Sequence, residues 1–66
     1  MTGTIKKITS DRGFGFIHGE DGVDYFFHQS DLRGGLTFAA LREGQRVRFE
    51  TRQGDKGPRA ADVNPA

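Results

Sequence analysis

Phenylalanine and glycine alternate in residues 12–17, which read Arg-Gly-Phe-Gly-Phe-Ile. Alternate residues of a β-strand share one face of the sheet. If this segment is a strand, Phe14 and Phe16 point to one side, while Gly15 and Ile17 point to the other. Two large rings side by side normally belong to a core. Any fold for this chain must therefore either bury these rings or present them as an exposed aromatic platform.

The chain is short and cannot form a disulfide bond. Its 66 residues suffice for one small domain, which we expect to span residues 1–66. A chain of this size buries only about 60% of the surface that it exposes when unfolded, so its stability should be marginal. Because the sequence has no cysteine, it predicts no disulfide framework. Its two histidines are too few for a convincing set of metal ligands, so we expect no metal site and no cofactor.

Charge and hydropathy limit the partners of the chain. Ten basic and nine acidic residues leave a formal net charge of +1. A nucleic acid would therefore not be held by charge alone, and its binding should depend only moderately on salt. No apolar run approaches the roughly 20 residues of a membrane span, and residues 1–6 lack the apolar segment of a signal peptide. We expect a cytoplasmic chain with no membrane partner.

Alternation and turn residues predict an all-β chain with one short helical turn. Ten glycines indicate many tight turns. The break in alternation at Lys6-Lys7-Ile8 predicts a β-bulge near Lys7. The helical turn is expected at Gln29–Leu32, after the third strand, and a long loop that follows it carries Phe38. The five expected strands are residues 3–9, 14–18, 23–28, 46–52 and 59–63.

A count of the inward-facing side chains decides between core and platform. Phe14, Phe16 and Phe26 share the parity opposite to that of the inward set, so they should gather on the outer face with His28 beside them. An exposed aromatic cluster is typical of a binding surface. The inward set fills a core by itself and comprises Ile5, Ile17, Tyr25, Phe27, Leu32, Val47, Phe49 and Val63.

The chemistry that suits such a platform is base stacking. An exposed ring can stack on any nucleobase, and each stack contributes about 1–3 kcal/mol. Because a double helix hides the faces of its bases, the expected ligands are single-stranded RNA and DNA. His28 could stack on a base or donate a hydrogen bond. The cations suited to phosphate contacts around the rings are Lys7, Arg12, Lys56 and Arg59.

These residues also have plain structural interpretations. The aromatic cluster could be buried against a second sheet or a second copy of the chain, and His28 could be an ordinary surface histidine. Lys7 and Arg12 could be solvated charges, and Phe38 could cap the barrel rather than stack on a base. Plain solvated surface is the favoured interpretation of His18, Arg46, Arg48 and Arg52.

A protein-interaction barrel is the alternative function, in which the aromatic cluster docks a peptide or a second copy of the chain. Under that hypothesis, replacing Phe14 or Phe26 with alanine would leave oligonucleotide binding untouched. We expect no enzymatic activity and no small-molecule substrate. The sequence offers no paired carboxylates, no nucleophile–base set and no Walker-type loop.

The chain resembles the bacterial cold-shock proteins at four segments in register, namely 12–17, 25–29, 43–47 and 56–58. The resemblance implies a five-stranded antiparallel OB-fold barrel. It also implies a monomer that binds single-stranded RNA and DNA, acts as an ATP-independent RNA chaperone, and regulates transcription or translation in the cold. The roles that it carries over are base stacking for Phe14, Phe16, Phe26 and His28, flanking stacking for Phe38, and phosphate contacts for Arg12 and Lys56.

The chain departs from the family pattern at the edge of the expected platform. Where the family commonly has Lys-Trp-Phe, this chain has Lys6-Lys7-Ile8, and Gln29 occupies a position that is often aromatic. The platform should therefore be narrower by up to three rings, each worth about 1–3 kcal/mol. We expect weaker and more salt-sensitive binding than in a typical member, unless contacts from Lys7 and Gln29 offset the loss.

Overall fold

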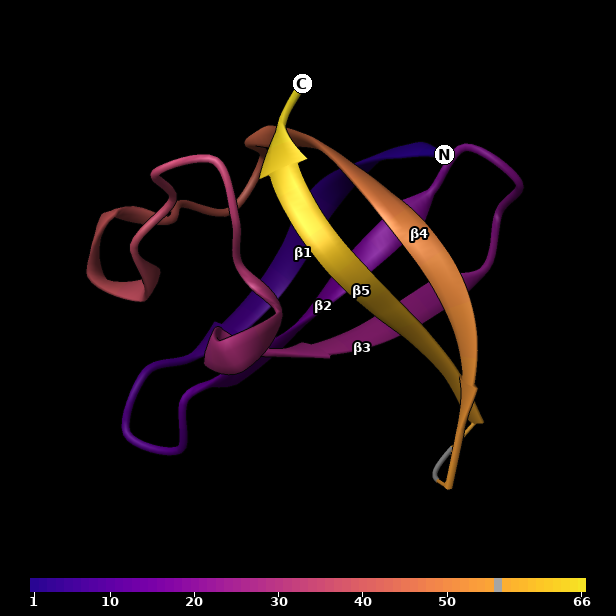
Figure 1. The fold of residues 1–66 in the computed structure, drawn as a ribbon, viewed down its shortest axis with the longest axis horizontal. Coiled ribbons are helices and arrows are strands. Elements are labelled where there is room, and N and C mark those ends of the chain that lie inside the picture. The colour runs from indigo at the N-terminus through magenta and orange to yellow at the C-terminus, as the bar shows by residue number, and fades with distance from the viewer. Residues whose placement is uncertain (56) are drawn as a thin grey trace.

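The computed structural model describes residues 1–55 and 57–66, and these form a closed five-stranded barrel with the strand order β1-β2-β3-β5-β4. In Figure 1, β4 and β5 cross in front of β1, β2 and β3. All neighbouring strands are antiparallel except β3 and β5, which are parallel. The elements are β1 (Thr2–Thr9), β2 (Phe14–Gly19), β3 (Asp24–His28), the 3-10 turns η1 (Gln29–Asp31) and η2 (Phe38–Ala40), β4 (Arg46–Gly54) and β5 (Gly57–Pro65).

The bulge predicted near Lys7 is confirmed. Ile5 pairs with Ile17, but Lys7 pairs with Phe16, so Lys6 is the extra residue of β1. The extra residue keeps Ile5 in the core and places Lys7 on the outer face opposite Phe16. Ile8, which pairs with Gly15, returns to the inner face and packs against the core.

The core contains most of the predicted inward set, with three differences. Leu32 is only partly buried, whereas Leu41 and Ala60 are core residues that the alternation pattern did not predict. Leu41 follows η2, a second helical turn within the segment predicted to be an irregular loop, and its N–H donates to the Phe38 carbonyl. The buried residues are Ile5, Ile17, Tyr25, Phe27, Leu41, Val47, Phe49, Ala60 and Val63.

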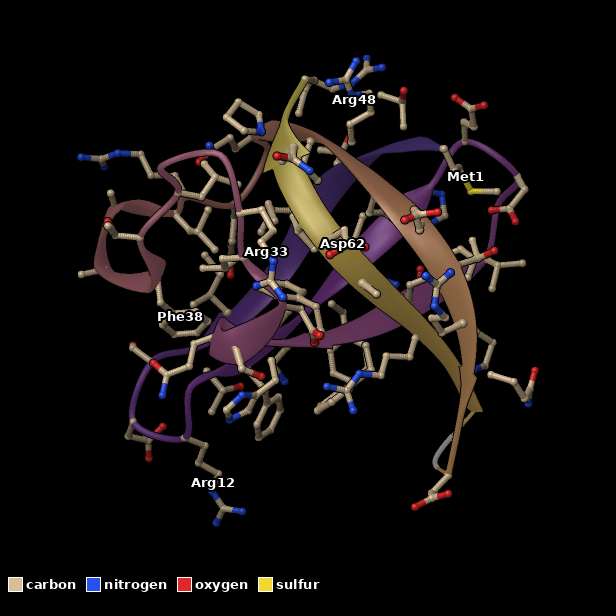
Figure 2. All side chains as sticks on the ribbon, in the orientation of Figure 1. Met1, Arg12, Arg33, Phe38, Arg48 and Asp62 are labelled. Carbon is tan, nitrogen blue, oxygen red and sulfur yellow. The ribbon has the colours of Figure 1, made fainter. Side chains whose placement is uncertain are left out.

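The β4–β5 hairpin is longer than predicted, because the pairing continues to Gly54 and Gly57 on either side of the turn. Its register shifts between Arg48 and Glu50, where Asp62 has a φ of 49°, the one positive φ of a non-glycine residue within the described ranges. Aspartate tolerates this left-handed conformation better than most residues. The Asp62 carboxylate lies 3.5 Å from the Arg33 guanidinium, and Figure 2 shows the two side chains together in front of β5.

The turn between β2 and β3 is tied to the core by one carboxylate. Asp21 accepts a hydrogen bond from the Tyr25 hydroxyl at 2.6 Å and another from the Val23 N–H at 3.1 Å. The bond to Tyr25 lowers the pKa of Asp21 and raises the pKa of Tyr25. The hydrogen bonds of Asp21 therefore favour its ionised form and hold the turn against the barrel.

Gly15 explains why the phenylalanines of β2 are separated by glycine. A Cβ at this position would lie 2.5 Å from the Lys7 carbonyl oxygen and 2.9 Å from ring carbon Cε1 of Phe27. The ring of Phe27, which is fully buried, fills the space that a side chain of residue 15 would need. The glycine is therefore required by packing on the inner face of β2.

We predict that Gly15→Ala destabilises the barrel by about 1–3 kcal/mol, because the added methyl overpacks the core. Phe27→Leu removes the ring carbons that the methyl would meet, so the double variant should lose less stability than the sum of the two single losses. Urea unfolding followed by far-ultraviolet circular dichroism measures all three variants. Additivity within about 0.5 kcal/mol would contradict the proposed contact.

Candidate functional site

Three phenylalanines form a cluster on the outer face of β2 and β3, as predicted. Phe16 pairs with Phe26 across the two strands, and Phe14 pairs with His28. The ring centroid of Phe26 lies 5.4 Å from that of Phe14 and 5.9 Å from that of Phe16. All three side chains are half-buried, so each ring keeps part of its surface exposed. We call Phe14, Phe16 and Phe26 the aromatic platform.

His28 borders the platform with its ring orientation fixed by η1. The Ser30 N–H donates to His28 Nδ1 at 3.2 Å, and Ser30 Oγ lies 3.0 Å from the same nitrogen. Because a backbone N–H can only donate, Nδ1 is the acceptor, and the proton of the neutral ring is on Nε2. His28 therefore offers an N–H donor at Nε2, in addition to the half-buried face of its ring.

Asp31 connects η1 to the edge of the platform. Its Oδ2 accepts from the His28 N–H at 2.9 Å and from Arg59 Nη2 at 3.0 Å. The Asp31 side chain is 14% exposed, so this ion pair is shielded from water on one side. Cζ of Arg59 lies 5.9 Å from the centroid of the Phe26 ring, within the range of a cation–π contact. Arg59 thus lies beside the platform with its charge partly compensated.

Lys7, Arg12 and Gln29 lie around the platform. Lys7 is exposed opposite Phe16, and both line a cavity of about 220 Å³. Arg12 projects into solvent from the β1–β2 turn (Figure 2). Gln29 is exposed, its N–H donates to the Gly13 carbonyl at 2.8 Å, and a Cβ at Gly13 would lie 3.1 Å from its amide. The structure therefore places Lys7 beside Phe16 and Gln29 beside Gly13, and it leaves Arg12 exposed in the β1–β2 turn.

Two further predicted site residues have different outcomes. Phe38 is partly buried against the core, with its ring centroid 6.3 Å from that of Phe27, and Figure 2 shows it on the long loop. The structure thus supports the interpretation that Phe38 closes the barrel, and base stacking by its remaining exposed surface stays a prediction. Lys56 lies outside the described residues.

The structure corrects the expected effect of Ile8. We expected its replacement of a common phenylalanine to remove a ring from the platform, but Ile8 packs against the core. Its face is set by the bulge, since the extra residue Lys6 shifts Lys7 outward and Ile8 inward. Relative to the family pattern, the expected narrowing of the platform therefore involves two aromatic positions, those of Lys7 and Gln29, and not three.

Asp24 is a polar residue beside the platform that sequence reasoning missed. Its carboxylate accepts from Lys6 Nζ at 2.7 Å and contacts His18 Nδ1 at 2.8 Å. The hydrogen bond from Lys6, followed by that from His18, lowers the pKa of Asp24. Asp24 also lines the cavity that contains Lys7 and Phe16, where it could accept a hydrogen bond from a base. The signal that could have revealed the contact between Asp24 and His18 is the register of the β2–β3 hairpin, in which these two residues pair.

Neither a membrane-crossing helix nor a metal site is found in the part of the chain that the structure describes. No helix there is long and apolar enough to span a bilayer. No group of three or more His, Cys, Asp or Glu side chains in residues 1–55 and 57–66 is arranged to hold a metal ion.

Comparison with known proteins agrees with this geometry. The "'Cold-shock' DNA-binding domain" family model matches residues 1–66. Cold shock protein 2 of Lactiplantibacillus plantarum is 49% identical over 63 residues, which are 96% of this chain and 94% of that protein. Cold shock protein CspC of Bacillus subtilis is 44% identical over 64 residues, which are 97% of this chain and 96% of that protein.

A solved structure shares the fold. The drosophila Unr CSD456 structure matches with a TM-score of 0.73 and 19% sequence identity. The match covers 98% of this chain but only 26% of that longer chain. At this identity the likeness establishes the barrel fold alone.

We predict that Asp31→Ala lowers the free energy of unfolding by about 1–2 kcal/mol, because it removes the Asp31 half of the η1 capping box and leaves Arg59 without its partner. Glu50→Ala is the matched control, since the Glu50 carboxylate forms an exposed pair with Arg52 at 3.7 Å. Removal of such an exposed pair should change stability by less than about 1 kcal/mol. Equal losses in the two variants, measured by urea unfolding, would contradict the role assigned to Asp31.

Proposed function

This chain belongs to the "cold-shock" DNA-binding domain family, and we propose that it binds nucleic acid in single-stranded form, both RNA and DNA. The observation that supports this proposal is the aromatic platform on the outer face of β2 and β3. A duplex buries the faces of its bases, whereas an unpaired strand can lay successive bases on exposed rings. Stacking is also tolerant of sequence, because every base has a π-face.

The surrounding residues have complementary roles in this proposal. Phe14, Phe16 and Phe26 stack on bases, and His28 donates from Nε2 to a base or a phosphate. Phosphate contacts come from basic side chains, and the Gln29 amide can bond a base edge. The cations proposed for phosphate contacts are Lys7, Arg12 and Lys56.

The biological activity that follows is that of an RNA chaperone. A protein that binds the unpaired strand and not the duplex shifts the equilibrium toward the melted form by mass action, without ATP. Melting of RNA structure is a direct route to the regulation of transcription or translation. We further propose that the 66 residues act as one monomeric domain without enzymatic activity.

Replacement of a platform ring tests the function. Phe26→Ala should weaken binding of a fluorescently labelled octanucleotide at least fivefold, because one stack is worth about 1–3 kcal/mol. Anisotropy titration of the labelled strand measures the affinity. Val23→Ala is the control, since Val23 is an exposed apolar residue in the β2–β3 turn, away from the platform. If Phe26→Ala folds and binds the oligonucleotide as well as the unchanged chain, the aromatic cluster serves as a protein interface instead.

Placing an aromatic side chain at position 7 tests whether the narrow platform lowers the affinity for oligonucleotides. We predict that Lys7→Trp tightens oligonucleotide binding, because residue 7 lies on the outer face opposite Phe16. The plot of log affinity against log salt should become shallower by about 0.7 if Lys7 is a phosphate contact. Arg48→Trp is the control, since Arg48 is an exposed cation of β4 that pairs with Thr2 of β1 and Asn64 of β5. Weaker binding by Lys7→Trp at every salt concentration would contradict the platform geometry.

A further inference from the structure

A cavity of about 260 Å³ lies between the platform and the β4–β5 hairpin. Its lining among the described residues comprises Phe26, Gly54, Asp55, Gly57 and Arg59. Phe26 and Arg59 are paired residues of the parallel strands β3 and β5, so the cavity continues directly from the edge of the platform. Gly54 and Gly57 have no side chains, so a flat ligand could approach the hairpin backbone closely.

Arg59 lines this cavity, and its guanidinium is held in place from two sides. Its Nη2 donates to Asp31 Oδ2 at 3.0 Å, and its Cζ lies 5.9 Å from the Phe26 centroid. Asp31 is in turn fixed by the His28 N–H at 2.9 Å. Arg59 thus has a defined position before any ligand binds, which lowers the entropic cost of using it as a contact.

The neighbouring carboxylate makes Arg59 a poor phosphate contact. A phosphate that approaches Nη2 also approaches Asp31, whose negative charge repels it. The guanidinium plane, in contrast, can stack on a nucleobase while its edge stays bonded to the carboxylate. Arg59 is therefore suited to contacting a base and not to neutralising the backbone.

We propose that this cavity is a further nucleobase subsite, in which a base stacks on the Arg59 guanidinium next to Phe26. This inference rests on the proposed binding of single strands and adds a fourth stacking surface to the three rings. Since the charge of Arg59 is compensated by Asp31, the subsite adds affinity without adding salt dependence. Stacking on Arg59 would offset part of the stacking that is lost because positions 7 and 29 carry no aromatic side chain.

The test is an anisotropy titration of labelled octathymidylate strands, each with one abasic residue at a different position. For the unchanged chain, each missing base that stacks should weaken binding about tenfold. In Arg59→Gln, one of these positions should lose its effect, while the positions that stack on the rings keep theirs. Because this readout compares ligands on the same variant, it does not depend on how stable that variant is.

Salt titration separates a base contact from a phosphate contact. The charge-neutral double variant Arg59→Gln/Asp31→Asn should leave the slope of log affinity against log salt unchanged, whereas Arg12→Gln should reduce it by about 0.7. Arg59→Lys should not restore the abasic effect, because lysine carries the charge but no plane. The subsite is overturned if the double variant reduces the slope as Arg12→Gln does, or if Arg59→Gln leaves every abasic effect in place. If no strand binds the unchanged chain, the proposed function itself fails.

Discussion

The packing of Phe27 against Gly15 is the contact on which the outer face of the barrel depends. Phe27 is fully buried, and its ring fills the space where residue 15 would carry a side chain. A slip of one residue in the β2–β3 register would turn Phe14 and Phe16 inward, where that ring leaves no room for them. The core therefore fixes the register, and the register brings Phe16 opposite Phe26 and Phe14 opposite His28. The buried contact between Phe27 and Gly15 thus determines where the exposed rings of the platform lie.

Asp31 organises the other edge of the platform in a similar way. A single carboxylate oxygen accepts from the His28 backbone and from the Arg59 side chain. It thereby joins η1, which orients the His28 ring, to β5, which carries Arg59. A carboxylate next to a nucleic-acid-binding surface would ordinarily repel the ligand. Here its charge is largely compensated by Arg59, and it holds two contact residues in fixed positions.

Local sequence patterns predicted the β2–β3 hairpin, the bulge of β1 and the outer location of the platform, because each depends on strand parity within one hairpin. The missed features arise from contacts between distant segments. Leu41 reaches the core because η2 turns the long loop over the barrel, and the Asp31–Arg59 ion pair joins residues 28 positions apart. The face of Ile8 depends on which residue of β1 is the extra one, and the alternation pattern did not decide this.

The distribution of charge indicates how the binding energy is divided. Lys7 and Arg12 form no ion pair within the described part of the chain, and Lys7 lies opposite Phe16. We therefore propose that stacking, at about 1–3 kcal/mol per base, supplies most of the affinity at this face. We expect Lys7 to add a phosphate contact where an aromatic residue would add a stacking contact, so salt should affect binding more than it would with an aromatic residue at position 7. Four of the Lys and Arg side chains are paired with carboxylates, as Lys6–Asp24, Arg33–Asp62, Arg52–Glu50 and Arg59–Asp31.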